Sequence, residues 1–356
     1  MGEPHRVGIV GLGVISRAYL STLVGHPAVR VAAVADLDHS RATAVAARVT
    51  GAEAVSVERL LGGDGVDTVL NLTIPAAHAQ IALGAIAGGK HVYAEKPLAV
   101  TFADGRSIVD AADAAGLRVG CAPDTVLGTG IQTARAAIDA GLVGRPVAAS
   151  ATMVTPGHER WHPNPDFYYV AGGGPLLDMG PYYVTALVHL LGPVRAVTGA
   201  ASRLRAERVI GSGPRAGERI PVEVDSHVTG VLEHEGGALT TVTTSFDAVA
   251  TTAAPIEVHG ETGTLRVPDP NRFDGETRLF PLGGSGWQVL EPSAGYVGAG
   301  RGIGLVDQVT SHGRASGALA LHVLEVMTAL LDSARAGRRV ELATTVRRPA
   351  PVPLTP

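Results

Sequence analysis

Short apolar segments alternate with amphipathic stretches over the first 122 residues of the chain. The apolar segments are rich in β-branched residues, and we expect strands at 6–10, 29–36, 66–72, 90–95 and 117–121. Ala-rich stretches with helical periodicity lie between them, at 14–25, 39–49, 76–88 and 103–115. Because the strands are apolar on both faces, they suit a parallel sheet that helices cover on each side. The pattern predicts a doubly wound α/β domain, a Rossmann fold, at residues 1–122.

The pattern changes after residue 122, and we expect a second, α+β domain at 123–356. Helices are expected at about 128–140, at about 175–191 and, after the last strand, at about 316–336. An apolar strand is expected at 146–155. From about 194 to 290 the chain alternates polar and apolar residues between turns, which predicts a large, open and mostly antiparallel sheet with one exposed face.

The composition narrows the classes of protein that the chain can belong to. Hydrophobic residues make up 46% of 356 and charged residues 17%, which excludes general disorder. The net charge of −4 argues against a nucleic-acid partner. No apolar run reaches the roughly 18 residues of a membrane span, and the first residues lack a signal-peptide pattern. With a single cysteine, Cys121, and no cluster with metal-ligand spacing, we expect a cytoplasmic protein without a metal.

A glycine-rich loop connects the first expected strand to the first expected helix. It contains Gly11, Gly13, Val14 and Ile15 in the pattern G-x-G-x-x-S. The first glycine permits a tight turn and the second lets a pyrophosphate approach the backbone, while the helix N-terminus offers free N–H groups. We therefore predict that these residues bind a dinucleotide, although a plain βαβ turn without nucleotide has the same pattern.

Asp36 lies at the end of the second expected strand, where a carboxylate accepts hydrogen bonds from the adenosine ribose. Its charge would repel a 2′-phosphate, so we expect NAD as cofactor. Arg41 is close in sequence and leaves NADP open.

Two further segments end at the carboxyl edge of the predicted sheet, where ligands of open α/β folds bind. They supply candidate cofactor contacts at Thr73, Pro75, His78, Glu95 and Lys96. Only Lys90 and Lys96 are lysines among the 29 basic residues. An amine that shifts its pKa readily is useful in catalysis, and arginine cannot replace it. Lys96 is thus a catalytic candidate, whereas Lys90 lies at the far edge of the sheet and is expected to be solvated.

A second group of polar residues is expected on one face of the helix that follows Gly172–Gly174. Asp178 and Tyr182 are four residues apart, so they stack one turn from each other. Such a pair can hold a hydroxyl group and exchange its proton, although a core tyrosine bonded to Asp178 would give the same pattern. Gly180 between them leaves room for a ligand or a close backbone, and His189 is expected to be structural.

Other polar and aromatic residues are weaker candidates. Residues that could line a substrate pocket are Asp124, His158, Trp161 and His162. The aromatic loop that contains the last three could equally form an ordered surface or an interface. Polar residues near the last helix are expected to be structural or surface groups: Arg301, His312, Arg314 and His322.

Three motifs together resemble the Gfo/Idh/MocA oxidoreductases (glucose–fructose oxidoreductase, inositol dehydrogenase and relatives). They are the loop at 11–16, Ala-Glu-Lys-Pro at 94–97 and the Gly-rich segment with Asp178 and Tyr182 at 172–183. The resemblance implies a Rossmann domain followed by an α/β domain, whose open sheet face often forms an oligomer interface. The Thr-rich strand at 238–245 suits such a face, so a homodimer or homotetramer is expected.

The resemblance also implies roles for the candidate residues. Lys96 would lie between the nicotinamide and the substrate, and Asp178 would hydrogen-bond the substrate. Many relatives have His where this chain has Tyr182, but some similar members carry Tyr there as proton donor or acceptor. The family's Asn-x-Arg segment after the sixth strand is replaced by residues 122–125, which puts substrate contacts transferred from inositol or sugar-phosphate relatives in doubt.

The expected reaction is hydride transfer between NAD(P) and a secondary alcohol or ketone of a sugar or polyol, with Lys96 and Tyr182 as the acid–base pair. Two alternatives stay open. One is a glycoside hydrolase or lyase that oxidises a sugar transiently, and the other is a non-catalytic NAD(P)-binding regulator. Neither the sugar nor the direction of the reaction follows from the sequence.

Overall fold

The computed structural model describes residues 3–310 and 313–355. The chain forms two compact units. The first contains Met1–Leu127 and Gly298–Leu324, and the second contains Gly128–Val297 and Glu325–Pro356. We expected one boundary, between residues 122 and 123. The compact units differ from this expectation because a late segment returns to the first unit.

The first unit is built on a six-stranded parallel sheet with the strand order β3-β2-β1-β4-β5-β6. Its strands are β1 (His5–Val10), β2 (Val29–Ala35), β3 (Glu53–Ala54), β4 (Thr68–Asn71), β5 (His91–Ala94) and β6 (Val119–Cys121). This is the order of a dinucleotide-binding Rossmann fold. The predicted doubly wound sheet is confirmed, whereas the two-residue strand β3 was not predicted.

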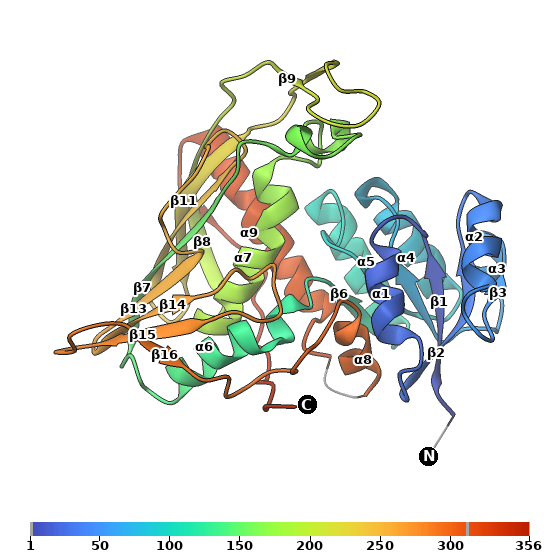
Figure 1. The fold of residues 1–356 in the computed structure, drawn as a ribbon, viewed down its shortest axis with the longest axis horizontal. Helices are drawn as coiled ribbons and strands as arrows, with labels where there is room; N and C mark the ends of the chain where they lie inside the picture. The colour runs from blue at the N-terminus through green and yellow to red at the C-terminus, as the bar shows by residue number, and fades with distance from the viewer. Residues whose placement is uncertain (1–2, 311–312, 356) are drawn as a thin grey trace. The chain divides into compact units, whose positions relative to one another are not determined.

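Helices cover this sheet. They are α1 (Ser16–Leu23), α2 (His39–Ala46), α3 (Val57–Gly62), α4 (His78–Ala87), α5 (Phe102–Ala114) and α8 (Ile303–Val309), with short 3₁₀ turns η1 (Pro75–Ala77) and η2 (Thr125–Leu127). In Figure 1, α2 and α3 lie together with β3 at one end of the unit. Val7, Ile9, Val34 and Leu70 are fully buried between sheet and helices. Their burial fixes the sheet whose carboxyl edge carries the candidate cofactor residues.

The second unit contains a nine-stranded mixed sheet with the order β16-β15-β14-β13-β7-β12-β11-β8-β17. Its strands are β7 (Pro146–Val154), β8 (Val194–Ser202), β11 (His227–His234), β12 (Leu239–Ser245), β13 (Ile256–Gly260), β14 (Gly263–Val267), β15 (Thr277–Pro281), β16 (Gln288–Leu290) and β17 (Val340–Glu341). Only the pair β7–β12 is parallel among the described strands of this sheet. The prediction of a large, mostly antiparallel sheet is confirmed.

A separate lobe of the second unit contains the strand pair β9 (Glu207–Val209) and β10 (Arg219–Pro221) and the 3₁₀ turns η3 (His158–Arg160) and η4 (Asp166–Tyr168). Helices α6 (Thr129–Asp139) and α7 (Pro175–Leu191) pack on the large sheet, and the later part of α9 (Gly317–Ala336) also belongs to this unit. Figure 1 shows α7 and α9 beside each other on one face of the sheet. No helix of the described residues lies on the opposite face.

Two glycines let α9 approach the sheet closely. Gly199 of β8 and Gly230 of β11 are register partners. A Cβ atom at Gly199 would lie 2.3 Å from the backbone oxygen of Leu330, and one at Gly230 would lie 2.7 Å from the Leu330 Cδ1. Both positions therefore need glycine for the helix to seat on the two strands.

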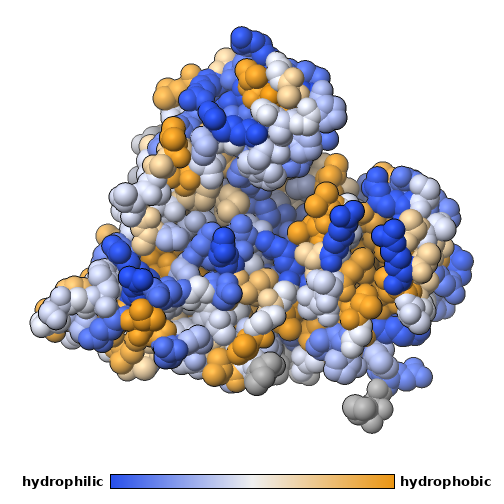
Figure 2. Space-filling model, viewed as in Figure 1, coloured by the Kyte–Doolittle hydropathy of each residue, from blue (hydrophilic) through white to orange (hydrophobic). Residues whose placement is uncertain are grey.

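Helix α9 is also the one described helix that is long and apolar enough to cross a membrane, with a mean hydropathy of 1.4 over its most apolar window. Of that window 67% is buried inside the structure, as in a core helix. On the face drawn in Figure 2, hydrophilic and hydrophobic residues are interspersed on both units.

Candidate functional site

The glycine loop after β1 has the geometry of an anion site. Gly11 has φ 91°, and a Cβ atom there would lie 2.7 Å from the backbone carbon and oxygen of Leu72. By contrast, no atom lies within 4 Å of a Cβ atom built on Gly13, so the space above it is open. Helix α1 starts beside this space without a side-chain cap and without an acidic residue in its first turn. Its N-terminal N–H groups and dipole thus favour a negatively charged group.

Three large apolar side chains are exposed at the carboxyl edge of the same sheet. Val14, Leu37 and Ile74 follow β1, β2 and β4, and their exposed fractions are 90%, 99% and 70%. Exposed apolar side chains gathered at one edge mark a binding surface. The sequence analysis named Val14 but missed Leu37 and Ile74. An apolar residue directly after a strand end was the available signal.

Asp36 is tied to the glycine loop. Its Oδ2 accepts a hydrogen bond from Leu12 N at 2.7 Å, and its Oδ1 accepts one from Asp38 N at 2.9 Å. The Arg41 guanidinium lies 3.3 Å from the same carboxylate and is half exposed. Asp36 therefore holds the loop in place as well as lying where a ribose is expected, and Arg41 partly compensates its charge.

Glu95 holds the turn that carries Lys96 through two hydrogen bonds. The Glu95 carboxylate accepts hydrogen bonds from Lys96 N at 3.0 Å and from the Tyr19 hydroxyl of α1 at 2.8 Å. Burial and the nearby Glu95 charge raise the pKa of Tyr19 well above its ordinary value, so Tyr19 stays a donor. Glu95 is buried and Lys96 is half buried. Glu95 thus joins α1 to the Lys96 turn.

In the second unit, Asp178 lies in the first turn of α7, where Asp178 N donates to Gly174 O at 3.0 Å. Its Oδ2 lies 3.1 Å from His158 Nε2 of η3. Both side chains are mostly buried, with exposed fractions of 16% and 11%. The structure therefore brings together Asp178 and His158, two candidates that the sequence analysis had assigned to different roles. Tyr182 is buried one turn further along the same helix.

Gly180 lies between Asp178 and Tyr182 and faces α9. A Cβ atom there would lie 2.9 Å from Met327 Sδ and 3.1 Å from Leu176 Cδ1. The expected room at Gly180 is thus used for helix packing.

Aromatic rings surround His158. Its ring contacts Trp161, Tyr168 and Phe246 with centroid distances of 5.2, 4.8 and 4.4 Å. Trp161 is 59% exposed. Its ring also contacts the ring of His162 edge to face, with a centroid distance of 5.4 Å. Burial lowers the pKa of His162 below its ordinary value, so this ring is neutral at neutral pH. The lobe thus presents an aromatic surface with a hydrogen-bonding His–Asp pair beneath it.

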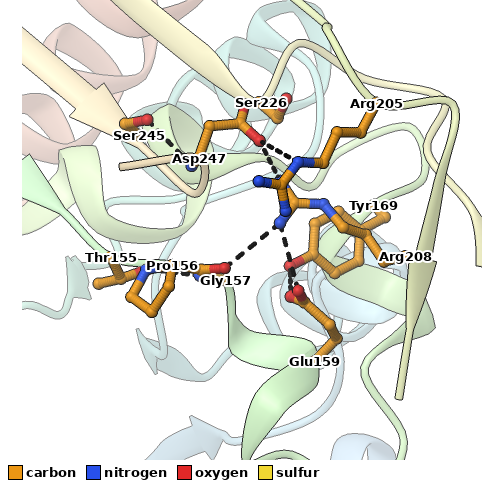
Figure 3. A network of polar contacts seen from close by, with 10 residues as sticks. All are labelled: Thr155, Pro156, Gly157, Glu159, Tyr169, Arg205, Arg208, Ser226, Ser245 and Asp247. Atoms are coloured by element: carbon orange, nitrogen blue, oxygen red, sulfur yellow. Dashed lines mark hydrogen bonds and ion pairs between the residues drawn. The ribbon is translucent and has the colours of Figure 1, made fainter. Parts of the chain in front are cut away.

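A buried ionic network next to His158 holds this lobe together (Figure 3). The Arg208 guanidinium contacts Glu159 Oε1 at 3.2 Å, Pro156 O at 3.3 Å and Asp247 Oδ1 at 2.5 Å. The Tyr169 hydroxyl donates to the other oxygen of Glu159, and its ring lies under the guanidinium. Because Glu159 follows His158 directly, the network fixes the turn that presents His158 to Asp178.

Comparison with known proteins places the chain in a family. Residues 5–122 match the family described as "Oxidoreductase family, NAD-binding Rossmann fold", and residues 131–266 match the "GFO/IDH/MocA C-terminal domain". The chain is 30% identical over 270 residues to 1,5-anhydro-D-fructose reductase of Ensifer adhaerens, which covers 73% of the chain and 75% of the relative. The chain belongs to the Gfo/Idh/MocA oxidoreductase family.

Two further similarities support the assignment. Inositol 2-dehydrogenase 3 of Saccharopolyspora erythraea is 30% identical over 269 residues, 75% of this chain and 74% of that protein. The crystal structure of an NAD binding oxidoreductase from Klebsiella pneumoniae superposes with a TM-score of 0.82 at 25% identity, and covers 96% of this chain and all of that one. This Gfo/Idh/MocA protein is therefore an NAD-binding oxidoreductase.

The residues of the first unit fit the dinucleotide. Gly13 leaves open space beside the uncapped N-terminus of α1, as a pyrophosphate requires. Asp36 lies at the end of β2, and exposed Val14, Leu37 and Ile74 offer apolar contacts at the same edge. We find no mismatch between these groups and NAD. The individual contacts of Gly11, Ile15, Thr73 and Pro75 with the cofactor stay predictions.

Three residues have a different environment from the one expected. Asp124 is fully buried in the first unit, and its Oδ2 accepts from Gly302 N at 2.7 Å and Gly304 N at 3.1 Å at the start of α8. It caps a helix, and this buried environment does not support the predicted place in the substrate pocket. Lys90 is buried instead of solvated, and its Nζ donates to Gly88 O at 3.2 Å. His78 is buried beneath the edge turns, where its ring bonds backbone oxygens and offers no open surface to a cofactor.

The remaining polar candidates are mostly buried. Arg314 pairs with Asp307, and His322 and His189 are fully buried. His312 lies outside the described residues. Over residues 3–310 and 313–355, no group of three or more His, Cys, Asp or Glu side chains is arranged to hold a metal ion.

Proposed function

We propose that this Gfo/Idh/MocA protein catalyses reversible hydride transfer between NAD and a secondary alcohol of a sugar or polyol, in the cytoplasm. NAD supplies the hydride acceptor: the alcohol carbon loses a hydride, its hydroxyl loses a proton, and a ketone, NADH and a proton result. The names of the relatives support the substrate class, because an anhydro sugar and inositol are both polyhydroxylated rings.

Three side chains would carry the chemistry. Asp178, held by His158, would accept a hydrogen bond from a substrate hydroxyl. Tyr182 would take the proton of the reacting hydroxyl, and the Lys96 ammonium would favour the phenolate that results. Trp161 and His162 would contact the apolar face of the sugar ring.

The observation that carries the proposal is the Asp178–His158 pair at the start of α7 in a chain of this family. A carboxylate held by a ring nitrogen in a mostly buried, aromatic setting binds a neutral polyhydroxylated ligand well, since it accepts hydrogen bonds in a place where water is scarce. A surface Asp has no need of such a partner.

A single-turnover assay tests the proposal. Enzyme at stoichiometric concentration would be mixed with NAD⁺ and a pool of sugars and polyols that includes myo-inositol, and in the reverse direction with NADH and 1,5-anhydro-D-fructose. We expect the near-ultraviolet absorbance of NADH to rise in the first case or fall in the second. Parallel samples with NADP⁺ and NADPH measure whether Asp36 and Arg41 select NAD over NADP.

Lys96→Met and Tyr182→Phe test the acid–base assignment. Lys96→Met should bind NADH and lose most of the turnover, whereas the control Lys90→Met removes the other lysine at a distance from the chemistry. If Tyr182→Phe or Lys96→Met kept wild-type turnover, the acid–base assignment would be wrong. Sugar cleavage without net change in NADH would instead support the hydrolase or lyase alternative.

A further inference from the structure

The imidazole of His78 lies between two backbone carbonyl oxygens. Its Nδ1 is 2.7 Å from Pro97 O, and its Nε2 is 3.0 Å from Thr73 O. The side chain is 1% exposed, at the first residue of α4. The ring therefore spans two separate turns at the carboxyl edge of the sheet of the first unit.

The two turns are those that carry candidate site residues. Pro97 follows Lys96 directly, so a hydrogen bond to Pro97 O acts one residue from the amine-bearing side chain. Thr73 begins the turn after β4, whose next residues include exposed Ile74. Asn71 completes the arrangement, since its Oδ1 accepts from Thr73 N and its Nδ2 donates to His78 O at 3.1 Å.

The chemistry of the ring decides which contact is the stronger. Carbonyl oxygens only accept, and a neutral imidazole has a single N–H to donate. Burial lowers the pKa of His78, and this outweighs the hydrogen bonds to Pro97 O and Thr73 O and the Glu95 charge, which raise it, so the neutral ring is favoured at neutral pH. The shorter contact, at Nδ1, then takes the proton. The bond to Pro97 O is kept in either protonation state, whereas Nε2 donates to Thr73 O only when the ring is protonated.

Glu95 holds the Lys96 turn from the other side. Its carboxylate accepts from Lys96 N, and its own backbone N donates to Asn71 O at 2.9 Å. The backbone is thus held on both sides of Lys96, by the hydrogen bonds of Glu95 before it and by a hydrogen bond to Pro97 O after it. Among the described contacts, His78 supplies the bond to Pro97 O.

We propose that His78 is a positioning residue that holds the Lys96–Pro97 backbone through Nδ1 and so sets the place of the Lys96 amine. The inference rests on the proposed function, in which Lys96 assists proton transfer. His78 touches neither substrate nor cofactor in this account. It acts through the backbone of its neighbours.

Two conservative substitutions separate the two bonds of the ring. The amide nitrogen of Asn occupies the place of His Nδ1, so His78→Asn keeps a donor for Pro97 O and loses the contact with Thr73 O. The longer Gln places its amide nitrogen near His Nε2, so His78→Gln donates to Thr73 O and loses the bond to Pro97 O. The two variants are matched in polarity and serve as controls for each other.

The scarcity of lysine gives a readout that does not depend on activity. Reductive ¹³C-methylation labels lysine amines, and this chain has only Lys90 and Lys96. The variant Lys90→Arg assigns the two lysine signals in the NMR spectrum. We expect the Lys96 signal of His78→Asn to coincide with that of the wild type and the signal of His78→Gln to shift, while the Lys90 signal stays in place in both.

The kinetic expectation follows the same division. With a substrate found in the single-turnover assay, His78→Gln should lower kcat by about 10- to 100-fold, because a misplaced catalytic group loses most of its effect. Its dissociation constant for NADH should stay near the wild-type value. His78→Asn, which keeps the donor to Pro97 O, should retain most of the wild-type kcat.

The inference is overturned if the two variants shift the Lys96 signal equally, or if neither shifts it. If both variants unfold, ¹⁵N NMR of the wild-type imidazole decides. A protonated Nδ1 supports the bond to Pro97 O, and a bare Nδ1 with the proton on Nε2 overturns it. Failure of every sugar in the turnover assay would count against the proposed function alone, since the lysine spectra and NADH affinities still test His78.

Discussion

Asp124 is a fully buried carboxylate whose Oδ2 accepts two backbone hydrogen bonds from the start of α8. Burial raises its pKa from 3.8 to about 6, against the two hydrogen bonds and the nearby Arg301, which lower it. The folded protein therefore keeps a proton on Asp124 at a pH where the unfolded chain has lost it. As the pH rises from about 4 through about 6, the free energy of unfolding falls, because the unfolded chain ionises first.

The variant Asp124→Asn should remove this pH dependence, since its amide oxygen accepts the same two hydrogen bonds without a charge. A shift of about two pKa units corresponds to about 3 kcal/mol. We expect the stability of the variant relative to wild type to rise by about that amount from pH 4 to pH 7. Urea unfolding of both proteins over this pH range measures it. A constant difference between them would show that Asp124 stays ionised throughout.

The same residue shows why some of the site could not be read from the sequence. A polar residue directly after a strand at the carboxyl edge is typical of a ligand contact, and Asp124 fits that pattern. Its actual partners, Gly302 and Gly304, come from about 180 residues later. His158 and Asp178 were each named as candidates, but their pairing depends on a turn and a helix that meet only in the folded unit. Local motifs predicted Lys96 and the glycine loop, whereas side-chain pairs needed the tertiary structure.

At the scale of elements, hydrophobic periodicity predicted the long helices and the buried strands well. Helix α7 was expected at 175–191 and occupies Pro175–Leu191, because its apolar face and the flanking glycines Gly174 and Gly192 both mark it. Short elements such as α3 and β3 were missed, since six or two residues carry too little periodicity. Helix α8 was missed for the same reason, and with it the return of residues 298–324 to the first unit.

The lobe with η3, β9 and β10 depends on the buried charges of Arg208, Glu159 and Asp247 (Figure 3). Removing one partner of a buried ion pair leaves the other charge uncompensated, which costs about 3–5 kcal/mol. We therefore expect Arg208→Met to lower the free energy of unfolding by an amount in that range, and to weaken turnover because η3 carries His158.

Arg215 offers a matched control in the same lobe. It also pairs with two acids, Asp166 and Glu218, but these three side chains are between a third and a half solvent-exposed, whereas the Arg208 network is buried. Exposed pairs contribute little to stability because water and salt screen them. Arg215→Met should thus leave urea unfolding near the wild-type curve. An equal loss of unfolding free energy in the two variants would contradict the larger contribution expected of the buried network.

At the scale of the whole molecule, the nine-stranded sheet leaves one face without a helix (Figure 1). Most outward positions on the central strands β7, β12 and β11 carry small, hydroxyl or aliphatic residues: Ala148, Ser150, Thr152, Thr229, Val231, Thr241 and Thr243. The charged Glu257 and Glu233 border this group, and each is paired with an arginine. An exposed sheet face is usually protected by charged side chains. A sheet face whose central positions carry no charge suits burial against a second protein surface.

We propose that this face joins two copies of the chain, in a homodimer or within a homotetramer. Sedimentation of the wild type should give a multiple of the 36.3 kDa chain mass. Thr241→Arg places a charge at the exposed centre of β12, where it would meet its own copy or a desolvated surface, so we expect this variant to sediment as a monomer with an unchanged circular dichroism spectrum. Thr43→Arg on the exposed side of α2 adds the same charge in the first unit and should leave the assembly intact. A wild-type protein that sediments as a monomer, or a Thr241→Arg variant that keeps the wild-type mass, would show that the sheet face does not join two copies of the chain.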